Sequence, residues 1–227
     1  MAKPKTNLMN LEPWRDHHKD QAIIVCGTGP SIRSVETLNK MMHHTLIGVN
    51  DVLRYIDTDY LVIIDKVSKM TEDRQEWIRK SRDTALAIFC NDPNEIHNYL
   101  SGGSAATVHI RPQVPIGNRT IDLRAKRFVH LAVTSPYSAI SLAAYMGATR
   151  IGLIGVDFTG HTLVNQMNRV EKHYRAMARA CERAGILLIN LNPDSLLQAV
   201  RKGTFDELGE PNWQPFSREN ARDQRLA

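Results

Sequence analysis

The sequence has few cysteines and no long apolar run. Its three cysteines, Cys26, Cys90 and Cys181, are odd in number and far apart, a pattern that fits neither a disulfide framework nor a zinc site. No apolar segment approaches the ~20 residues that a membrane-spanning helix requires. Residues 1–5 also lack the apolar stretch of a secretory signal. We therefore expect a reduced, cytoplasmic protein without a membrane span.

The motifs of several enzyme classes are missing as well. The sequence contains no Gly-x-Ser-x-Gly elbow, no His-Glu-x-x-His motif and no Cys/His pair, so nucleophilic hydrolysis and zinc chemistry have no support. Gly27 and Gly29 open a turn of the dinucleotide-binding type, but Ile32 stands where the third glycine is required. No Gly-Lys-Ser/Thr of a P-loop follows, and we expect no protein-bound metal.

What is present is the composition of one folded domain. The 227 residues are 42% hydrophobic, which is enough for a core and too much for wholesale disorder. Apolar runs alternate with helical segments, which predicts an α/β, Rossmann-like fold with a mostly parallel sheet flanked by helices. We expect a polar N-terminal arm at 1–20, a single domain at 21–202 and a polar C-terminal tail at 203–227.

Apolar runs and turn signals place the elements along the chain. Continuous apolar stretches predict strands, at 22–26, 45–49, 61–64, 85–89, 150–155 and 186–191. Helical segments are expected at 32–42, 71–80, 136–146 and 164–184, with a short helix from Pro193. The stretch 91–127 contains several prolines and glycines and is expected to form loops at one rim of the site. Regular structure is expected to return at 128–133.

Polar residues follow directly after most of the predicted strands. Ligands bind at the carboxyl ends of the strands in an open parallel sheet, so these residues are candidates for binding. In the loop after the first strand, small residues would let a phosphate approach backbone N–H groups at a helix start. The alternative is a tight strand–helix turn. The candidates are Gly27, Thr28, Gly29, Pro30, Ser31, Asn50, Asp65, Thr134, Ser135, Asp157, Asn192, Pro193 and Ser195.

Individual side chains have both a functional and a structural interpretation. Asn50 donates and accepts at once, which suits a base or ribose edge, and the alternative is a cap on the next short helix. Asp65 and Asp157 end apolar strands, where a carboxylate needs water, a ligand or a cation, and Asp157 is also a catalytic candidate. Candidates for a general base are His161, in a loop after a strand, and His173, in the long helix. Their alternatives are a loop hydrogen bond and helix packing.

The surplus of positive charge is concentrated in two places. The formal net charge is +5 and the isoelectric point is about 9.2. One cluster lies in the irregular segment and would suit an acceptor or a polyanion; it comprises Arg111, Arg119, Arg124, Lys126 and Arg127. The other falls on one face of the long helix, where a solvated surface is the commoner explanation; it comprises Lys172, Arg175, Arg179 and Arg183.

An ordered set of motifs resembles a known family. Residues 24–31 (Ile-Val-Cys-Gly-Thr-Gly-Pro-Ser) and 48–51 (Gly-Val-Asn-Asp) resemble the opening of the bacterial family-42 sialyltransferases. The segments at 134–137, 144–147, 151–158 and 192–197 follow in the same order as in that family. Motility-associated-factor glycosyltransferases and archaeal 6-hydroxymethylpterin diphosphokinases look similar, with a Gly-Pro-Ser loop and an Asp at the third strand end. The resemblance covers roughly residues 22–200.

The resemblance implies a Rossmann-like domain that binds a nucleotide-activated donor. The Gly29–Ser31 loop would hold phosphate, Asn50 the ribose or base, and the residues Asn192, Pro193 and Ser195 would line the base pocket. Ser135 matches the Thr-Ser pair of the sialyltransferases, whereas Asp65 stands where they use an Asn and Thr28 replaces their Asn before Gly-Pro-Ser. The segment after Phe158 is shorter than their lid, and Asn168 falls near the place of their catalytic histidine.

Taken with the strand-end residues, the resemblance indicates a nucleotide-dependent transferase. The expected activity is that of a glycosyltransferase with a CMP- or UDP-type sugar donor and an acceptor hydroxyl activated by His161 or His173. The acceptor would be a glycan or a nucleic acid, the latter including modified DNA for a phage-encoded enzyme. One alternative is a diphosphokinase in which Asp65 and Asp157 hold Mg²⁺ on ATP. Another is a non-catalytic module that binds nucleotides or nucleic acid. Whether the chain assembles into a homo-oligomer is left open by the sequence.

Overall fold

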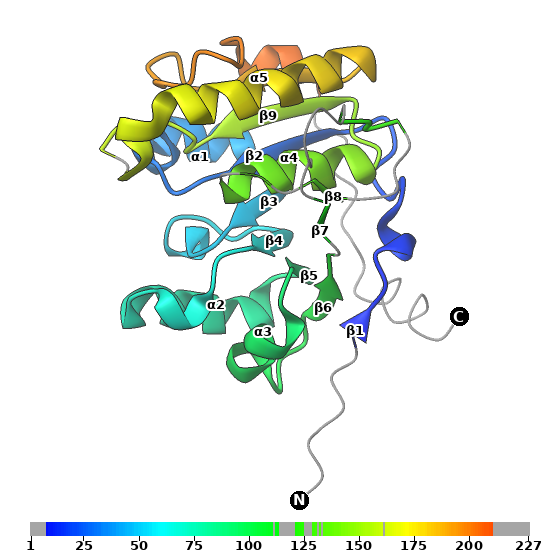
Figure 1. Cartoon of the computed structure of the whole chain (residues 1–227), viewed down its shortest axis with the longest axis vertical. Coiled ribbons are helices and arrows are strands. Elements are labelled where there is room, and N and C mark those ends of the chain that lie inside the picture. The colour runs from blue at the N-terminus through cyan, green and yellow to red at the C-terminus, as the bar shows by residue number, and fades with distance from the viewer. Residues whose placement is uncertain are drawn as a thin grey trace, which may run out of the picture.

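The centre of the fold is a parallel sheet. The computed structural model describes residues 8–110, 112–113, 121–124, 129–130, 132, 134–160 and 162–210. Eight strands form the sheet in the order β1-β6-β5-β4-β3-β2-β9-β10, and every neighbouring pair is parallel (Figure 1). The expected α/β, Rossmann-like class is confirmed. The strands are β1 (Leu8–Met9), β2 (Ala22–Cys26), β3 (Thr45–Val49), β4 (Tyr60–Ile63), β5 (Ala87–Cys90), β6 (Ala106–His109), β9 (Arg150–Ile154) and β10 (Leu187–Asn190).

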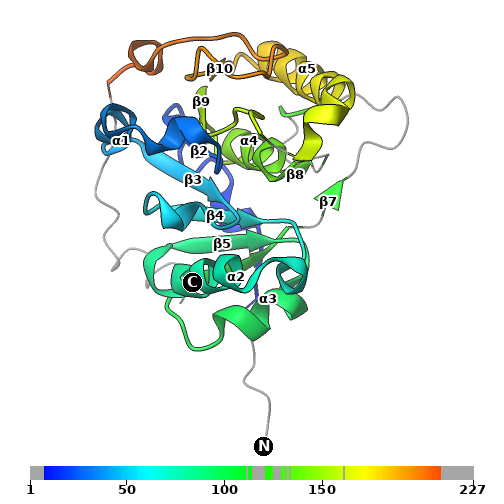
Figure 2. The same ribbon diagram turned by 90° about the vertical axis from the view of Figure 1, so that its left-hand side faces the viewer.

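Helices cover both faces of this sheet. Around the central strands, α4 and α5 lie on one side and α1 on the other (Figure 2). A second, two-stranded parallel pair, β7 (Pro112–Gln113) with β8 (Val129–His130), lies apart from the main sheet. The α-helices are α1 (Val35–Met41), α2 (Glu72–Thr84), α3 (Pro93–Leu100), α4 (Ser135–Tyr145) and α5 (Met167–Arg183). The 3-10 turns are η1 (Glu12–Trp14), η2 (Pro30–Arg33), η3 (Val52–Arg54), η4 (Val67–Lys69), η5 (Thr162–Gln166) and η6 (Phe205–Leu208).

The apolar runs of the strands feed two separate cores. Successive strand side chains point to opposite faces, so Ile23 and Val25 of β2 join the core beneath α4 and α5. Ile24 and Cys26 join the core beneath α1, α2 and α3. Both sets are fully buried, which explains why the strand reads as a continuous apolar run rather than an alternating one.

The order of the strands reverses beside β2. From β2 the chain moves outward through β3, β4, β5 and β6 in one direction, then returns through α4 to place β9 on the opposite side of β2. The loops that follow β2 and β9 therefore leave their strands toward opposite faces of the sheet. Such a reversal creates a crevice at the carboxyl edge of a parallel sheet.

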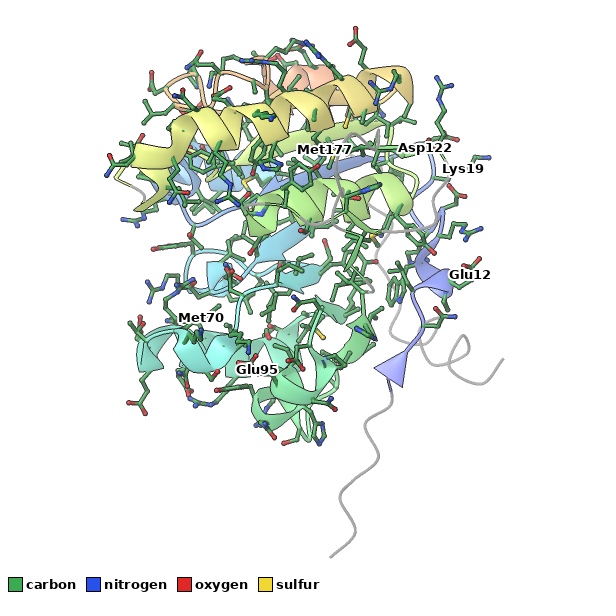
Figure 3. The ribbon with its side chains drawn as sticks, in the orientation of Figure 1. Glu12, Lys19, Met70, Glu95, Asp122 and Met177 are labelled. Atoms are coloured by element: carbon green, nitrogen blue, oxygen red, sulfur yellow. The ribbon has the colours of Figure 1, made fainter. Side chains whose placement is uncertain are left out.

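The segment that precedes β2 packs onto the domain, which differs from the polar arm expected at 1–20. Leu8–Met9 pairs with β6 at the sheet edge, and Leu11 and Trp14 are buried in the core beneath α4. His18 lies between Gln21 and Tyr60, with its ring nitrogens 2.8 Å from the Gln21 Oε1 and the Tyr60 hydroxyl. The few apolar residues in this charged stretch are enough to hold it against the sheet, on the side of the molecule where Glu12 and Lys19 lie (right in Figure 3).

The segment after residue 202 also contributes to the fold. Leu208 of η6 is fully buried in the core beneath α1. Thr204 and Glu207 form a reciprocal capping box at the start of η6, which satisfies backbone N–H groups that would otherwise be unpaired. The expected polar tail therefore includes a packed turn at 203–210, and the remainder of the tail, 211–227, lies outside the described residues.

Three expectations about individual elements are wrong. The irregular stretch 91–127 contains α3 and β6; Asp92 caps α3 by accepting from the Glu95 N–H at 3.1 Å, with Pro93 in the first turn. The helix expected at 32–42 is divided, because Ser34 is extended and caps α1. No helix forms at 191–200, where Asn192 and Ser195 side chains take backbone N–H groups two residues ahead.

In the part of the chain that the structure describes, no helix combines the length and apolarity needed to cross a membrane.

Candidate functional site

A pocket lies where the strand order reverses. Its volume is about 290 Å³, and its walls come mainly from the loops that follow β2 and β9, as expected for a ligand site in a doubly wound sheet. Of the residues predicted from the sequence, Gly27–Pro30, Thr134 and Asp157 line it. The full lining is Gly27, Thr28, Gly29, Pro30, Arg33, Val49, Thr134, Pro136, Gly155, Val156, Asp157, Phe158, Thr159 and Gly160.

The glycines of this pocket allow two loops to pack against each other. A β-carbon on Gly27 would overlap the Gly155 carbonyl, and one on Gly155 would overlap the Gly27 carbonyl. A β-carbon on Gly29 would lie 2.5 Å from the Asp157 Oδ2. Gly155 also has a φ of +66°, a conformation that L-residues rarely adopt. The glycines are therefore required for the approach of residues 155–157, a reason that the sequence does not reveal.

The carboxylate of Asp157 connects these loops by hydrogen bonds. Its Oδ2 accepts the Ser31 N–H at 2.8 Å, and its Oδ1 accepts the Ser31 hydroxyl and the Asn192 amide, both at 2.7 Å. The Ser31 hydroxyl oxygen in turn accepts the Gly155 N–H at 2.9 Å. Asp157 is 2% exposed, and such hydrogen bonds to a buried carboxylate are the strong ones. This arrangement makes Asp157 a residue that positions the pocket wall.

Several backbone N–H groups that were expected to face a phosphate already have partners within the protein. The N–H groups of Gly27 and Gly29 donate to the carbonyls of Ile154 and Gly155, each at 2.8 Å, and that of Ser31 is taken by Asp157. The α-helix begins only after Ser34, so its dipole does not start at Pro30. An anion in this pocket would therefore be bound by side chains more than by this loop's backbone.

The cation that the sequence reasoning missed is Arg33. It lines the pocket, and its guanidinium lies 4.8 Å from the centre of the Tyr55 ring and donates to the Tyr55 hydroxyl at 3.0 Å. Stacking on an aromatic face restrains a planar guanidinium while its remaining N–H donors stay available. The feature of the sequence that could have indicated Arg33 is its position two residues after the Gly-Pro-Ser loop.

A second polar cluster lies next to the pocket lining. The carboxylate of Asp65 accepts the Asn50 amide at 3.1 Å and the Ser135 hydroxyl at 3.2 Å. Asn50 has a φ of +51°, an uncommon conformation for a residue other than glycine. Asp65 is exposed, whereas Ser135 is buried. Three residues predicted separately thus form one cluster that follows β3 and β4 and opens α4.

Thr134 and the expected base His173 belong to the contact between α4 and α5. The Thr134 hydroxyl lies 2.7 Å from the Tyr174 hydroxyl, whose pKa is raised by burial. The His173 ring packs edge-on to Tyr137, with ring centres 6.3 Å apart. Partial burial, followed by the neighbouring cations Arg169 and Lys172, lowers the pKa of His173. His173 is absent from the pocket lining, so its described contacts are those of a packing residue.

The loop after β10 packs against the pocket-lining segment 156–157. The Ser195 hydroxyl donates to the Val156 carbonyl at 2.8 Å, and the Leu196 N–H donates to the Asp157 carbonyl at 2.9 Å. Lys202 donates from Nζ to the Ser195 carbonyl at 2.7 Å. Pro193 is exposed in the same loop. No residue of the loop after β10 lines the pocket, so the predicted base-pocket residues Asn192, Pro193 and Ser195 contact residues of its wall without lining it.

Several predicted residues lie outside the part of the chain that the structure describes. They are His161, Arg111, Arg119, Lys126 and Arg127, whereas Arg124 is described and exposed. Thr159 and Gly160, the residues directly before His161, line the pocket. Among the described residues, no group of three or more His, Cys, Asp or Glu side chains is arranged to hold a metal ion.

The comparisons with known proteins identify the fold. No family model and no curated protein matches the chain. A MAf glycosyltransferase from Magnetospirillum magneticum AMB-1 superposes with a TM-score of 0.56 at 12% identity, covering 93% of this chain and 37% of that one. The sialyltransferase CstII from Campylobacter jejuni, solved with cytidine-5'-monophosphate, gives 0.50 at 14% identity, covering 86% of this chain and 89% of that one. The chain thus spans little more than a third of the first enzyme, and it shares the fold of these glycosyltransferases.

Proposed function

We propose that this protein is a glycosyltransferase that binds a nucleotide-activated sugar in the pocket between the loops after β2 and β9. The observation that carries the proposal is the position of the pocket at the reversal of strand order, in a fold shared with glycosyltransferases. The neighbour solved with cytidine-5'-monophosphate makes a cytidine nucleotide the first donor type to test, with a uridine nucleotide as the second.

The chemistry of the lining suits such a donor. Val49, Pro136 and Phe158 supply apolar surface for a base or sugar ring, and Arg33 supplies a positive charge for phosphate. The volume of about 290 Å³ lies just below the ~300–1,000 Å³ typical of ligand pockets. We therefore expect the pocket to hold part of the donor, with the Asn50–Asp65–Ser135 cluster binding hydroxyl groups beyond it.

We assign the general base to His161. It directly follows Thr159 and Gly160 of the lining, whereas His173 packs on Tyr137. A neutral imidazole would remove the proton of the acceptor hydroxyl as that oxygen bonds to the anomeric carbon of the donor. The bond from the anomeric carbon to the phosphate oxygen breaks in the same step, and the nucleotide leaves. Asp157 would take no proton in this step and would keep the wall in place.

Replacing His161 by alanine should lower the rate of sugar transfer, or of donor hydrolysis, by about 100-fold or more, because general-base catalysis contributes roughly 10²–10⁴. Nucleotide affinity should be retained. His173→Ala is the matched control and should stay within about 3-fold of the wild-type rate. Loss of rate in His173→Ala with activity kept in His161→Ala would move the base to the helix.

A thermal-shift screen tests the donor class directly. Cytidine and uridine nucleotides and their sugars should raise the melting temperature; a ligand at 100 times its Kd adds ~2.7 kcal/mol to the stability of the folded state, or about 5–10 °C for a chain of this size. Stabilisation by ATP with Mg²⁺ alone would favour the diphosphokinase and refute the glycosyltransferase. No shift with any nucleotide would favour a module without donor chemistry.

Arg33→Ala should weaken the affinity for the stabilising nucleotide by about 10-fold or more, since a hydrogen bond to a charged group contributes ~1.5–3 kcal/mol. Arg79→Ala is the matched control, because Arg79 also lies over a tyrosine ring, that of Tyr99 at 5.6 Å, but belongs to α2 and does not line the pocket. Titration calorimetry measures both variants. Equal affinity in wild type and Arg33→Ala would place the phosphate elsewhere.

A further inference from the structure

The exposed face of α5 carries a ridge of positive charge. Its cations recur every three or four residues and therefore project from one side of the helix. At 1.5 Å per residue, the ridge extends about 21 Å along the helix axis. We call it the α5 ridge; it comprises Arg169, Lys172, Arg175, Arg179 and Arg183, all exposed.

Acidic neighbours neutralise little of this charge. Glu171 approaches Arg175 at 3.9 Å and is largely buried, and Glu182 is the other acidic residue of the helix. Among the residues that the structure describes, Arg169, Lys172 and Arg179 have no ion-pair partner. Like charges at this spacing destabilise a helix, and a merely solvated face usually mixes the two signs. The ridge therefore favours an anionic partner over a passive solvated surface.

The opposite face of α5 fixes the ridge on a rigid support. Val170, Tyr174 and Met177 are fully buried, and Met177 lies between α5 and α4 (Figure 3). The exposed face offers no large apolar side chain, whereas a helix that inserts into a lipid surface needs an exposed apolar face. A membrane is therefore the less favoured anionic partner.

The two ends of the ridge meet other functional features. At the C-terminal end, Arg183 donates to the Ile121 carbonyl at 3.2 Å, and Asp122 lies at this end in Figure 3. At the N-terminal end, η5 joins α5 to the segment that contains Gly160 of the pocket. A polymer bound along the ridge would thus lead toward the pocket rim.

We infer that the α5 ridge binds the phosphate backbone of double-stranded nucleic acid. Measured along the duplex axis, the length of the ridge equals the rise of ~6 phosphates of each strand at 3.4 Å per phosphate. Four of its five cations are arginines, whose planar guanidinium matches phosphate geometry. Binding of nucleic acid to the ridge does not depend on the proposed function. Only the further consequence, that the nucleic acid is the acceptor, rests on it. Binding itself is measured without any donor, so the two proposals fail separately.

Fluorescence anisotropy with a labelled 24-base-pair DNA duplex tests the ridge on the full chain. The test variant replaces Arg169, Lys172 and Arg179 by glutamine; the control replaces Arg79, Lys80 and Arg82 of α2 by glutamine, for the same change in charge. Each lost phosphate contact lowers the slope of log K against log[NaCl] by ~0.9. The test variant should therefore lose about 2.7 of the slope, and the control should lose less than 1.

The following binding results would overturn the inference. Absence of duplex binding at 50 mM NaCl, or equal losses in both variants, would return the ridge to a solvated surface. Tighter binding to vesicles with anionic lipid, or to heparin with no binding to the duplex, would assign a different polyanion. Circular dichroism melting of both variants within 2 °C of wild type would exclude misfolding as the cause of a loss.

Discussion

Replacing Gly155 by alanine should lower the free energy of unfolding by about 3 kcal/mol or more. Its φ of +66° strains any residue with a side chain, at roughly 1–3 kcal/mol, and the added β-carbon overlaps the Gly27 carbonyl. Relief of that overlap requires the two pocket loops to separate. Urea unfolding measures the loss, and we expect a fall of ~6–12 °C in the melting temperature.

Gly185→Ala separates the strain from the overlap. Gly185 has a φ of +73°, but a β-carbon there would meet nothing within 4 Å. We expect a loss of about 1 kcal/mol, the cost of the left-handed backbone alone. If the two variants lost the same stability, the close packing of the loops after β2 and β9 would be refuted.

Replacing Asp157 by alanine should cost about 3 kcal/mol and abolish nucleotide binding together. The change leaves the Ser31 N–H and the Asn192 amide without the acceptors that they have at 2.8 and 2.7 Å, and each buried unpaired donor costs ~1–3 kcal/mol. The Ser31 hydroxyl would lose its bond to Asp157 as well, so only its contact with the Gly155 N–H would remain as a side-chain hydrogen bond between Ser31 and the loop after β9. Denaturation and calorimetry on the same samples measure both effects.

Asp194→Ala is the control, in the loop after β10 that contacts Asp157 through Asn192. Asp194 is exposed, and a surface substitution of this kind should change stability by no more than ~0.5 kcal/mol. If Asp157→Ala kept the wild-type free energy of unfolding, the carboxylate would not stabilise the packing of the pocket loops. Full stability with lost transfer would instead give Asp157 the catalytic role that its place at a strand end first indicated.

The strands at the centre of the sheet could be predicted from the sequence because their surroundings are uniform. The segments 22–26 and 45–49 are buried along their whole length, so each appears as an unbroken apolar run with turn residues after it. The edge of the sheet was harder to predict from the sequence. β6 was missed because Ala106–His109 is only partly buried, and the prolines around it suggested a loop.

The candidate site could be located but not interpreted from the sequence. Polar residues after β2 and β9 indicated the edge at which the pocket lies, since parallel strands share it. The partner of Ser31 is Asp157, which is 126 residues away, and such a pairing leaves no local pattern. Gly27 and Gly29 therefore predicted a phosphate cradle, although they are needed for packing against Gly155. Nothing in the sequence pointed to Arg33 as a pocket residue except its short distance from the Gly-Pro-Ser loop.

The central claim is that the pocket at the reversal of strand order binds the donor nucleotide. Amide chemical-shift mapping of the ¹⁵N-labelled full chain, titrated with cytidine-5'-monophosphate and then uridine diphosphate, tests it most directly. The account predicts that one of them perturbs a contiguous set of amides in 27–33 and 155–160, and that Arg33→Ala weakens this response without moving it. Perturbations confined to other parts of the sheet, or none with either nucleotide, would contradict the claim.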